Sequence, residues 1–199
     1  MARTGRPREF NRDDAVKKAM QLFWRKGYES TSLAELRETL GNLSAASFYA
    51  AFGSKQALYC ECLELYEQTC GETVSLLEDS SLTAAVALER MFHKTISMQT
   101  SPITPMGCMA VLSGLNCCDE NGEIEAVTRS FRNKLRHALA ACVKRGVAAG
   151  EWNHSMDVAS YIVLLETYLN GISIQARDGV GREALIASLS LLMSVWKSA

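Results

Sequence analysis

Residues 32–55 read SLAELRETLGNLSAASFYAAFGSK, and they contain the start signals of two short helices. The first four of these residues form a capping-box pattern, which predicts the start of a short helix that ends at Gly41. Ser44 is placed to cap a second short helix, predicted over 45–52. Two short helices joined by a glycine-containing turn are typical of a helix-turn-helix.

Helices are predicted on both sides of this pair. Apolar residues recur at helical spacing between the N-cap Asn11 and Gly27, which predicts a first helix. After Ser54 the amphipathic segments are longer, and they predict helices over 55–78, 82–99, 107–118, 123–149, 156–176 and 182–197. No segment of useful length alternates apolar and polar residues, so we expect no sheet. The predicted fold class is all-α, with an N-terminal three-helix helix-turn-helix domain over residues 1–53 and a larger C-terminal helical domain over residues 54–199.

The composition excludes several classes of protein. The chain has 199 residues, of which 48% are hydrophobic and 22% charged, with a formal net charge of -1. These values exclude a disordered, collagen-like or coiled-coil protein. No apolar run approaches the roughly 18 residues that a membrane-spanning helix needs, and no apolar segment follows the basic start of the chain, so we expect no membrane partner and no secretory signal. Seven cysteines without a CxxC pair are typical of a reducing cytoplasm, which predicts a cytoplasmic location.

The charge is distributed unevenly along the chain. Residues 1–55 contain ten basic and six acidic side chains, whereas the remainder contains 11 basic and 16 acidic ones. A basic end on a near-neutral protein indicates that this end meets a polyanion. Arg3, Arg6 and Arg8 form a cationic arm, typical of segments that enter a minor groove or follow phosphates, and a tail without a partner is the alternative.

The predicted helix over 45–52 has one apolar and one small-residue face. Phe48 and Phe52 lie one turn apart and are expected to point into a small core. The outer face then consists of small residues, which lets a helix enter the major groove deeply. The outward residues are Ala45, Ala46, Ser47 and Tyr49.

A set of residues between Arg12 and Leu58 occurs in a characteristic order: Ala19, Leu22-Phe23, Gly27-Tyr28, Thr31-Ser32-Leu33, Gly41, Ser44, Ser47-Phe48-Tyr49, Phe52 and Ser54-Lys55. This segment resembles the DNA-binding domain of the TetR/AcrR family. The resemblance covers about the first 60 residues by motif and the rest by helix count. The sequence departs from the family at Ala50 and Ala51, where larger side chains are frequent, so specificity would depend more on the arm and on DNA shape.

The resemblance implies a homodimeric transcriptional regulator. Residues 1–53 would bind a pseudo-palindromic operator in double-stranded DNA, and residues 54–199 would dimerise and bind a small-molecule effector that relieves repression. Lys55 stands at the first position of a helix, where a cation is unfavourable unless a phosphate lies nearby. The residues expected to bind DNA are Arg3, Arg6, Arg8, Thr31, Ser32, Ser44, Ala45, Ala46, Ser47, Tyr49 and Lys55.

The last two predicted helices carry wide apolar stripes, which must be covered by another apolar surface. The resemblance implies that these helices form a four-helix bundle between two subunits, and burial within one chain is the alternative. The residues expected at the dimer interface are Tyr161, Leu165, Tyr168, Ile172, Leu185, Leu189, Leu192 and Trp196. The residues expected in the effector pocket are Tyr66, Phe92, Met98, Cys108, Met109, Leu112, Cys117 and Trp152, each of which could instead belong to the core.

Two alternative functions remain open. Cys108, Cys117 and Cys118 could form a thiol switch, because a helix beginning after Gly107 would lower the pKa of the Cys108 thiol. A protein-interaction module without specific DNA binding is the other alternative. We expect no metal, since no His or carboxylate is spaced as a partner ligand for these cysteines, and no cofactor or enzymatic activity, since the common catalytic motifs are missing.

Overall fold

The computed structural model describes residues 11–151 and 157–197, with the side chains of residues 70, 71 and 197 left aside, and within these ranges it contains helices and no strand. The all-α fold class is confirmed, as are the three short helices at the N-terminal end. The elements are α1 (Arg12–Lys26), α2 (Leu33–Thr39), α3 (Ala45–Phe52), α4 (Lys55–Glu78), α5 (Ala84–Gln99), α6 (Met109–Leu112), the 3₁₀ helix η1 (Asp119–Asn121), α7 (Gly122–Ala148), α8 (Val158–Arg177) and α9 (Arg182–Lys197).

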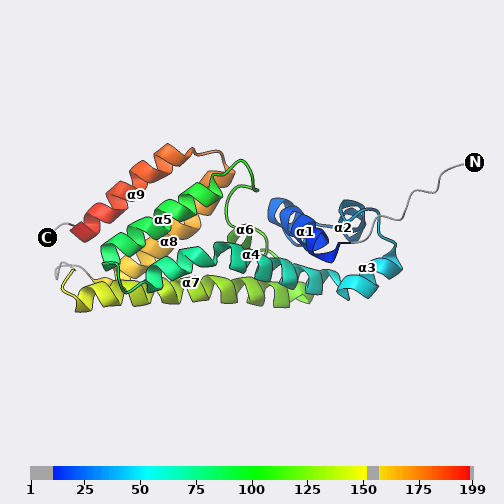
Figure 1. Ribbon diagram of the computed structural model, residues 1–199, viewed down its shortest axis with the longest axis horizontal. Coiled ribbons are helices and arrows are strands. Elements are labelled where there is room, and N and C mark those ends of the chain that lie inside the picture. Colours follow the sequence, from blue (N-terminus) through cyan, green and yellow to red (C-terminus); the bar gives the residue numbers. More distant parts are fainter. Residues whose placement is uncertain (1–10, 152–156, 198–199) are drawn as a thin grey trace, which may run out of the picture.

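The molecule is elongated (Figure 1). Helices α1, α2 and α3 form one end, and α5, α8 and α9 form the other. The long helices α4 and α7 pack side by side and connect the two ends, and α6 lies between α1 and this pair. In the described ranges no helix is long and apolar enough to cross a bilayer.

Polar N-caps begin the helices at the N-terminal end. The Asn11 side chain accepts a hydrogen bond from the amide of Asp14 (3.0 Å), and the Ser44 hydroxyl accepts one from the amide of Ser47 (3.0 Å). Each cap satisfies an amide that has no partner within its helix. Gly27 ends α1 with a φ of 84°, a left-handed conformation that glycine adopts without a steric penalty.

The helix expected over residues 107–118 is shorter than predicted, because α6 contains only four residues. The chain leaves the helix at Ser113, whose hydroxyl donates to the carbonyl of Met109 (2.6 Å) and is also bonded to the Tyr59 hydroxyl (2.6 Å). The next residue, Gly114, passes so close to α7 that an added Cβ would lie 2.7 Å from Cγ2 of Thr128. These contacts favour a turn between α4 and α7 over another helical turn.

Two hydrophobic cores hold the molecule together. The first joins α1, α2 and α3 to the N-terminal half of α4, to α6 and to Ile124 of α7. The second joins α5, α8 and α9 to Leu77 of α4 and to the C-terminal half of α7. Helices α1, α2 and α3 therefore bury apolar surface against one another and also against α4 and α6, which lie beyond the domain boundary predicted after residue 53.

The eight residues expected at the dimer interface belong to the second core or lie beside it. Seven of them are almost completely buried within the single chain, and Tyr168 is partly buried, with its hydroxyl donating to the carbonyl of Leu185 (2.8 Å). Side chains that are already buried within one protomer have little exposed apolar area left to pack against a second protomer. The assignment of these seven to the dimer interface is therefore corrected: Tyr161, Leu165, Ile172, Leu185, Leu189, Leu192 and Trp196 pack inside the protomer.

A glycine in α7 allows the second core to close. An added Cβ at Gly146 would lie 2.6 Å from Cβ of Ala84 and 2.7 Å from Cζ2 of Trp196. We therefore expect Gly146→Ala to lower the free energy of unfolding by about 1–3 kcal/mol, although alanine is the better helix former. Urea unfolding measures this change.

Gly122→Ala is the matched control. Gly122 has a helical φ of -55°, and nothing lies within 4 Å of an added Cβ. This substitution is expected to leave stability unchanged or to raise it. Equal stability of the Gly146→Ala variant and the wild type would contradict the close packing described for α7.

Candidate DNA-binding surface and inner cavity

The outer face of α3 is open to solvent. Phe48 and Phe52 are buried in the first core, as predicted. Tyr49 has 51% of its surface exposed, and its ring contacts that of Phe48 edge-on at 5.7 Å. Ser44, Ala45, Ala46 and Ser47 are also exposed. The helix thus presents small side chains and one tyrosine, a surface that fits a major groove.

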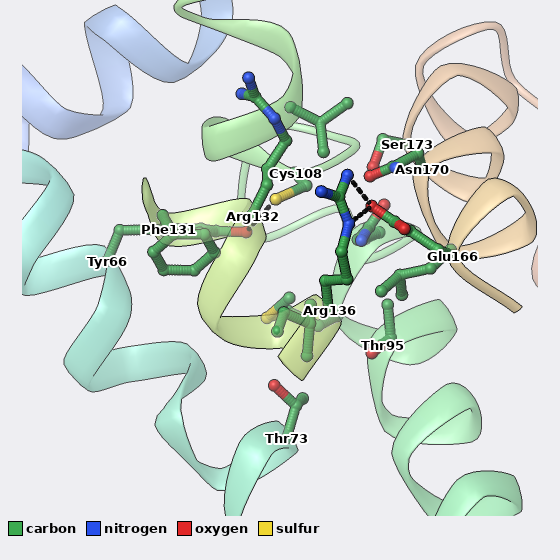
Figure 2. Close-up of a pocket in the computed structure, with 15 residues that line it drawn as sticks. Tyr66, Thr73, Thr95, Cys108, Phe131, Arg132, Arg136, Glu166, Asn170 and Ser173 are labelled. Atoms are coloured by element: carbon green, nitrogen blue, oxygen red, sulfur yellow. Dashed lines mark hydrogen bonds and ion pairs between the residues drawn. The ribbon is translucent and has the colours of Figure 1, made fainter. Parts of the chain in front are cut away.

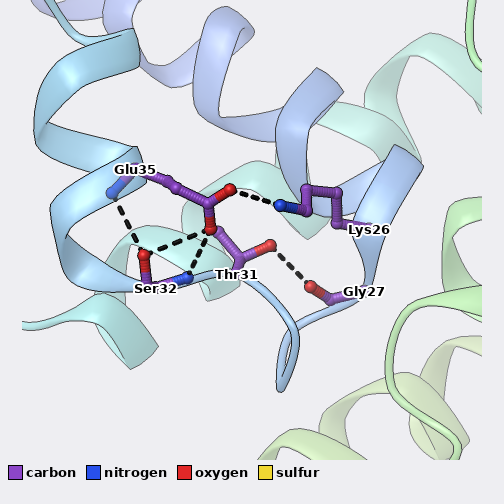
Figure 3. Close-up of polar contacts among 5 residues, drawn as sticks. All are labelled: Lys26, Gly27, Thr31, Ser32 and Glu35. Carbon is purple, nitrogen blue, oxygen red and sulfur yellow. Dashed lines mark hydrogen bonds and ion pairs between the residues drawn. The ribbon is translucent and has the colours of Figure 1, made fainter.

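The N-terminus of α2 lies at the same end of the molecule (Figure 1), and Figure 3 shows its polar contacts. The Ser32 hydroxyl accepts from the amide of Glu35 (3.2 Å), and Glu35 Oε2 accepts from the amide of Ser32 (3.1 Å), which completes the predicted capping box. Glu35 also forms an ion pair with Lys26 of α1. These contacts tie α2 to α1 and leave Ser32 exposed.

Thr31 does not fit its predicted role. Its side chain is fully buried, and its hydroxyl donates to the carbonyl of Gly27 (2.7 Å; Figure 3). A buried hydroxyl with a backbone partner cannot reach a phosphate. The prediction that Thr31 binds DNA is therefore wrong; this residue fixes the turn between α1 and α2.

Lys55 has partners within the chain. Its ammonium group lies 4.1 Å from the centre of the Tyr28 ring, a cation–π contact. Burial lowers the pKa of Lys55, and the Glu29 carboxylate opposes this shift. Tyr28 and Glu29 thus offset part of the unfavourable position of this cation at the helix start, and the contact of Lys55 with a phosphate stays a prediction.

Four of the predicted site residues lie outside the described ranges: Arg3, Arg6, Arg8 and Trp152.

A cavity of about 40 Å³ lies between α4, α5, α7 and α8, beside the segment that carries α6 (Figure 2). Of the residues expected in an effector pocket, Tyr66, Met98 and Cys108 line it. Phe92 and Met109 belong instead to the buried cores, and Leu112 and Cys117 pack against the first core. The remaining lining residues are Thr73, Thr95, Gln99, Val111, Phe131, Arg132, Leu135, Arg136, Glu166, Leu169, Asn170 and Ser173.

The polar lining residues could have been found from the sequence. Thr95 and Gln99 are four residues apart on α5, and Glu166, Asn170 and Ser173 follow one another at helical spacing on α8. Polar residues that recur on an otherwise buried face indicate a polar cavity or a buried network. A search limited to aromatic residues, methionines and cysteines overlooks them.

Of the two arginines at the cavity, Arg136 is paired with a carboxylate and Arg132 is bonded to a backbone carbonyl. Arg136 donates through Nε to Glu166 Oε1 (2.7 Å), and the same carboxylate lies 2.5 Å from Nη2 (Figure 2). This hydrogen bond raises the pKa of Arg136. Arg132 donates to the carbonyl of Ala110 (2.6 Å), and burial lowers the pKa of Arg132. No lining carboxylate is therefore left to pair with a cationic ligand, because Glu166 is the one carboxylate among the lining residues.

Cys108 and Cys117 do not have the lowered pKa expected of a thiol switch, and Cys118 is exposed. Cys108 is buried and accepts a hydrogen bond from the Tyr66 hydroxyl (3.1 Å). Burial raises the pKa of the Cys108 thiol and also that of Cys117. The prediction of a lowered pKa at Cys108 is wrong, because burial outweighs the four-residue helix that begins there. In the part of the chain that the structure describes, no three His, Cys, Asp or Glu residues gather in a group that could hold a metal ion.

The Glu35 contacts predict a pH dependence. The hydrogen bond from Lys26, followed by that from the Ser32 amide, lowers the pKa of Glu35 from 4.5 to about 2. A carboxyl whose pKa is lowered on folding stabilises the fold above its unfolded pKa, and this stabilisation is lost as the pH falls through the folded one. We expect Glu35→Gln to lower the melting temperature at pH 7, with the difference from wild type shrinking as the pH falls from about 4.5 towards 2.

The control is Glu38→Gln on the same helix, since Glu38 is in no ion pair among the described residues. Thermal unfolding of both variants between pH 7 and pH 3 makes the comparison. A destabilisation by Glu35→Gln that stays constant over this range would show that the carboxylate charge contributes nothing.

Comparison with known protein families gives two matches. Residues 15–62 match the family model "Bacterial regulatory proteins, tetR family", and residues 84–179 match "Tetracyclin repressor-like, C-terminal domain". The first match contains α2 and α3 and most of α1, and the second contains α5, α6, α7 and α8. Both parts of the molecule thus resemble the same class of protein.

Individual relatives agree with the family models. The chain is 32% identical over 195 residues to the HTH-type transcriptional repressor ComR of Escherichia coli (strain K12), which covers 96% of this chain and 91% of ComR. It is 27% identical to the HTH-type transcriptional repressor BdcR of the same organism, covering 94% of this chain and 89% of BdcR. A solved structure of a cysteine mutant of the TetR family transcriptional regulator CifR, complexed with 26-bp operator DNA, superposes with a TM-score of 0.87 at 33% identity, over 96% of this chain and 100% of that one. The chain therefore belongs to the TetR family of bacterial transcriptional regulators.

Proposed function

We propose that the protein is a transcriptional repressor that binds a pseudo-palindromic operator as a homodimer and is released by a small molecule bound in the inner cavity. The observation that carries this proposal is the exposed face of α3, held at one end of the chain by a capped helix-turn-helix. The names of the relatives support it, since ComR and BdcR are repressors and CifR is seen with operator DNA. A regulator of this kind acts on the chromosome, so we propose a cytoplasmic location and no catalytic role.

The DNA-binding surface that we propose consists of the outer face of α3 and the N-terminus of α2. Ala45, Ala46, Ser47 and Tyr49 would face base edges. Ser32, Ser44 and Lys55, the last at the start of α4, would face phosphates. Two copies of α3 in a dimer would enter successive major grooves, about 34–36 Å apart. We assign this role to residues 1–53 and assign effector binding and dimerisation to residues 54–199.

For dimerisation we propose the outer faces of α8 and α9. Val163 and Leu164 of α8 and Leu191 of α9 are 61%, 43% and 74% exposed, and Ile174 is 52% exposed. Large apolar side chains exposed on two neighbouring helices are typical of a surface that a second subunit covers. The corrected interface thus lies on the face opposite to the buried stripe of the same helices.

Coupling between the cavity and the DNA-binding helices would pass through Arg177 in the last turn of α8. This guanidinium donates to the carbonyls of Trp24 (2.8 Å), Arg25 (3.0 Å) and Met106 (3.1 Å). The first two carbonyls are at the end of α1, where they have no partner within the helix. An effector that moves α8 would therefore move α1 and shift the population away from the DNA-bound arrangement.

Selection from a random duplex library at near-physiological salt tests the DNA-binding proposal, since nonspecific phosphate binding is weak there. We expect the wild type to enrich an inverted repeat. The double variant Tyr49→Ala with Lys55→Ala should bind the selected sequence about tenfold or more weakly, because a groove contact and a cation near the phosphates are both lost.

Lys144→Ala is the control, because this exposed lysine is on the far part of α7. Fluorescence anisotropy gives the affinities, and sedimentation checks that each variant remains dimeric. Enrichment of no sequence, or equal binding by the double variant, would contradict the proposed surface.

A second prediction concerns Arg177. The variant Arg177→Gln loses charge-assisted hydrogen bonds to the end of α1, so the α1–α3 unit is held less firmly and fewer molecules have the arrangement that binds DNA. We expect operator affinity to fall at least about fivefold. Arg182→Gln, at the exposed start of α9, should not change it. Unchanged affinity of Arg177→Gln would rule out this coupling route.

A further inference from the structure

We propose that the inner cavity binds an uncharged molecule with an apolar body and a hydroxyl group, the class of small alcohols and phenols. The proposal rests on the proposed function in treating the cavity as the effector site, and it adds the chemistry of the effector. It starts from two polar side chains that the fold leaves unsatisfied.

Two lining residues have a buried polar atom without a hydrogen-bond partner. They are Gln99 of α5, at its Oε1, and Ser173 of α8, at its Oγ. Gln99 is 3% exposed and Ser173 is 0% exposed. Buried polar atoms are paired in most folded proteins, so each of these atoms indicates a place for a bound group.

Both residues lie beside Gly107, at one end of the cavity. The Gly107 amide donates to the carbonyl of Gln99 (2.9 Å), and an added Cβ at Gly107 would lie 2.6 Å from the carbonyl oxygen of Ser173. Gly107 thus has neighbours on both α5 and α8. Because both residues also line the same cavity, we assign their two unsatisfied side chains to one polar site.

The chemistry of these atoms selects the ligand. The amide oxygen of Gln99 accepts a hydrogen bond, whereas the Ser173 hydroxyl can donate or accept. A ligand hydroxyl can donate to the first and pair with the second. A carboxylate cannot donate to Gln99 Oε1, so it would leave this atom unpaired even if it were attracted by Arg132, which also lines the cavity. An ammonium group finds no free carboxylate, because Glu166 is paired with Arg136.

The rest of the cavity suits an apolar body. Met98, Val111, Phe131, Leu135 and Leu169 line it. The cavity of about 40 Å³ has room for only a few waters, but it shares Thr73, Phe131 and Leu135 with a groove of about 400 Å³ between α4 and α7. Movement of Phe131 and Leu135 would join the two spaces, with the hydroxyl at Gln99 and Ser173 and the apolar body towards the groove.

Calorimetric titration of the full chain with phenol, toluene and benzoate tests the proposal, since the three probes share a ring and differ in the polar group. We expect phenol to bind about tenfold or more tightly than either of the others. In the double variant Gln99→Met with Ser173→Ala, this preference over toluene should fall to less than about threefold. Thermal unfolding verifies that the variant folds.

Thr104→Val is the matched control. The Thr104 hydroxyl is also buried without a partner, but it does not line the cavity. This variant should keep the wild-type preference for phenol. Three results would each overturn the proposal. The first is that toluene or benzoate binds as tightly as phenol, and the second is that the preference for phenol survives in the double variant. The third is that no probe binds, because water alone fills the cavity.

The outcome separates this inference from the proposed function. Selection of an operator together with no preference for phenol would reject the ligand class and leave the repressor intact. Preferential phenol binding by a protein that enriches no DNA sequence would reject the repressor and leave the cavity as a binding site.

Discussion

The attachment of the end of α1 to the segment around α6 is the interaction on which the rest of the structure depends. The indole of Trp24 donates to the carbonyl of Gly107 (3.0 Å), and the amide of Tyr28 donates to the carbonyl of Ser113 (2.8 Å). Arg177 adds its hydrogen bonds to the last carbonyls of α1. Three short helices bury too little apolar surface for independent stability. The contacts with α4 and α6 supply the missing burial and fix the direction in which α3 points.

The same segment forms part of the cavity wall. Residues 107–113 therefore contribute both to the cavity and to the attachment of α1. Cys108 and Val111 line the cavity, and Gly107, which precedes them, donates its amide to the carbonyl of Gln99 at the end of α5. Gly107 has a φ of 81° and no room for a Cβ, so a small shift of α5 or α8 cannot be absorbed at this position. A ligand that moved these helices would have to move the segment and, with it, α1. This is a physical route for coupling two sites that lie in different parts of the molecule.

Local patterns in the sequence predicted most of the helices, and long-range packing explains where they failed. The caps at Asn11, Ser32 and Ser44 depend on hydrogen bonds within four residues, so the start of each short helix could be predicted. The apolar stripes of α8 and α9 were also visible, but periodicity shows which face is apolar and not what covers it. The early end of α6 depends on Tyr59 and Thr128, which are distant in sequence. The polar positions of α5 and α8 could be seen in the sequence, but packing decides that they meet at one cavity. The DNA-contact roles of α3 remain predictions.

Native-state hydrogen exchange measures the central claim most directly, because it reports which backbone amides open together. The amide of Tyr28 crosses from the N-terminal helices to the segment that carries α6. If the N-terminal helices and the segment around α6 form one unit, this amide and those of residues 107–113 open with similar free energies. Saturating operator DNA then raises the protection of both, although residues 107–113 lie away from α3. Protection that rises only within α1, α2 and α3, with residues 107–113 unchanged, would show that the DNA-binding helices move independently and would contradict the account.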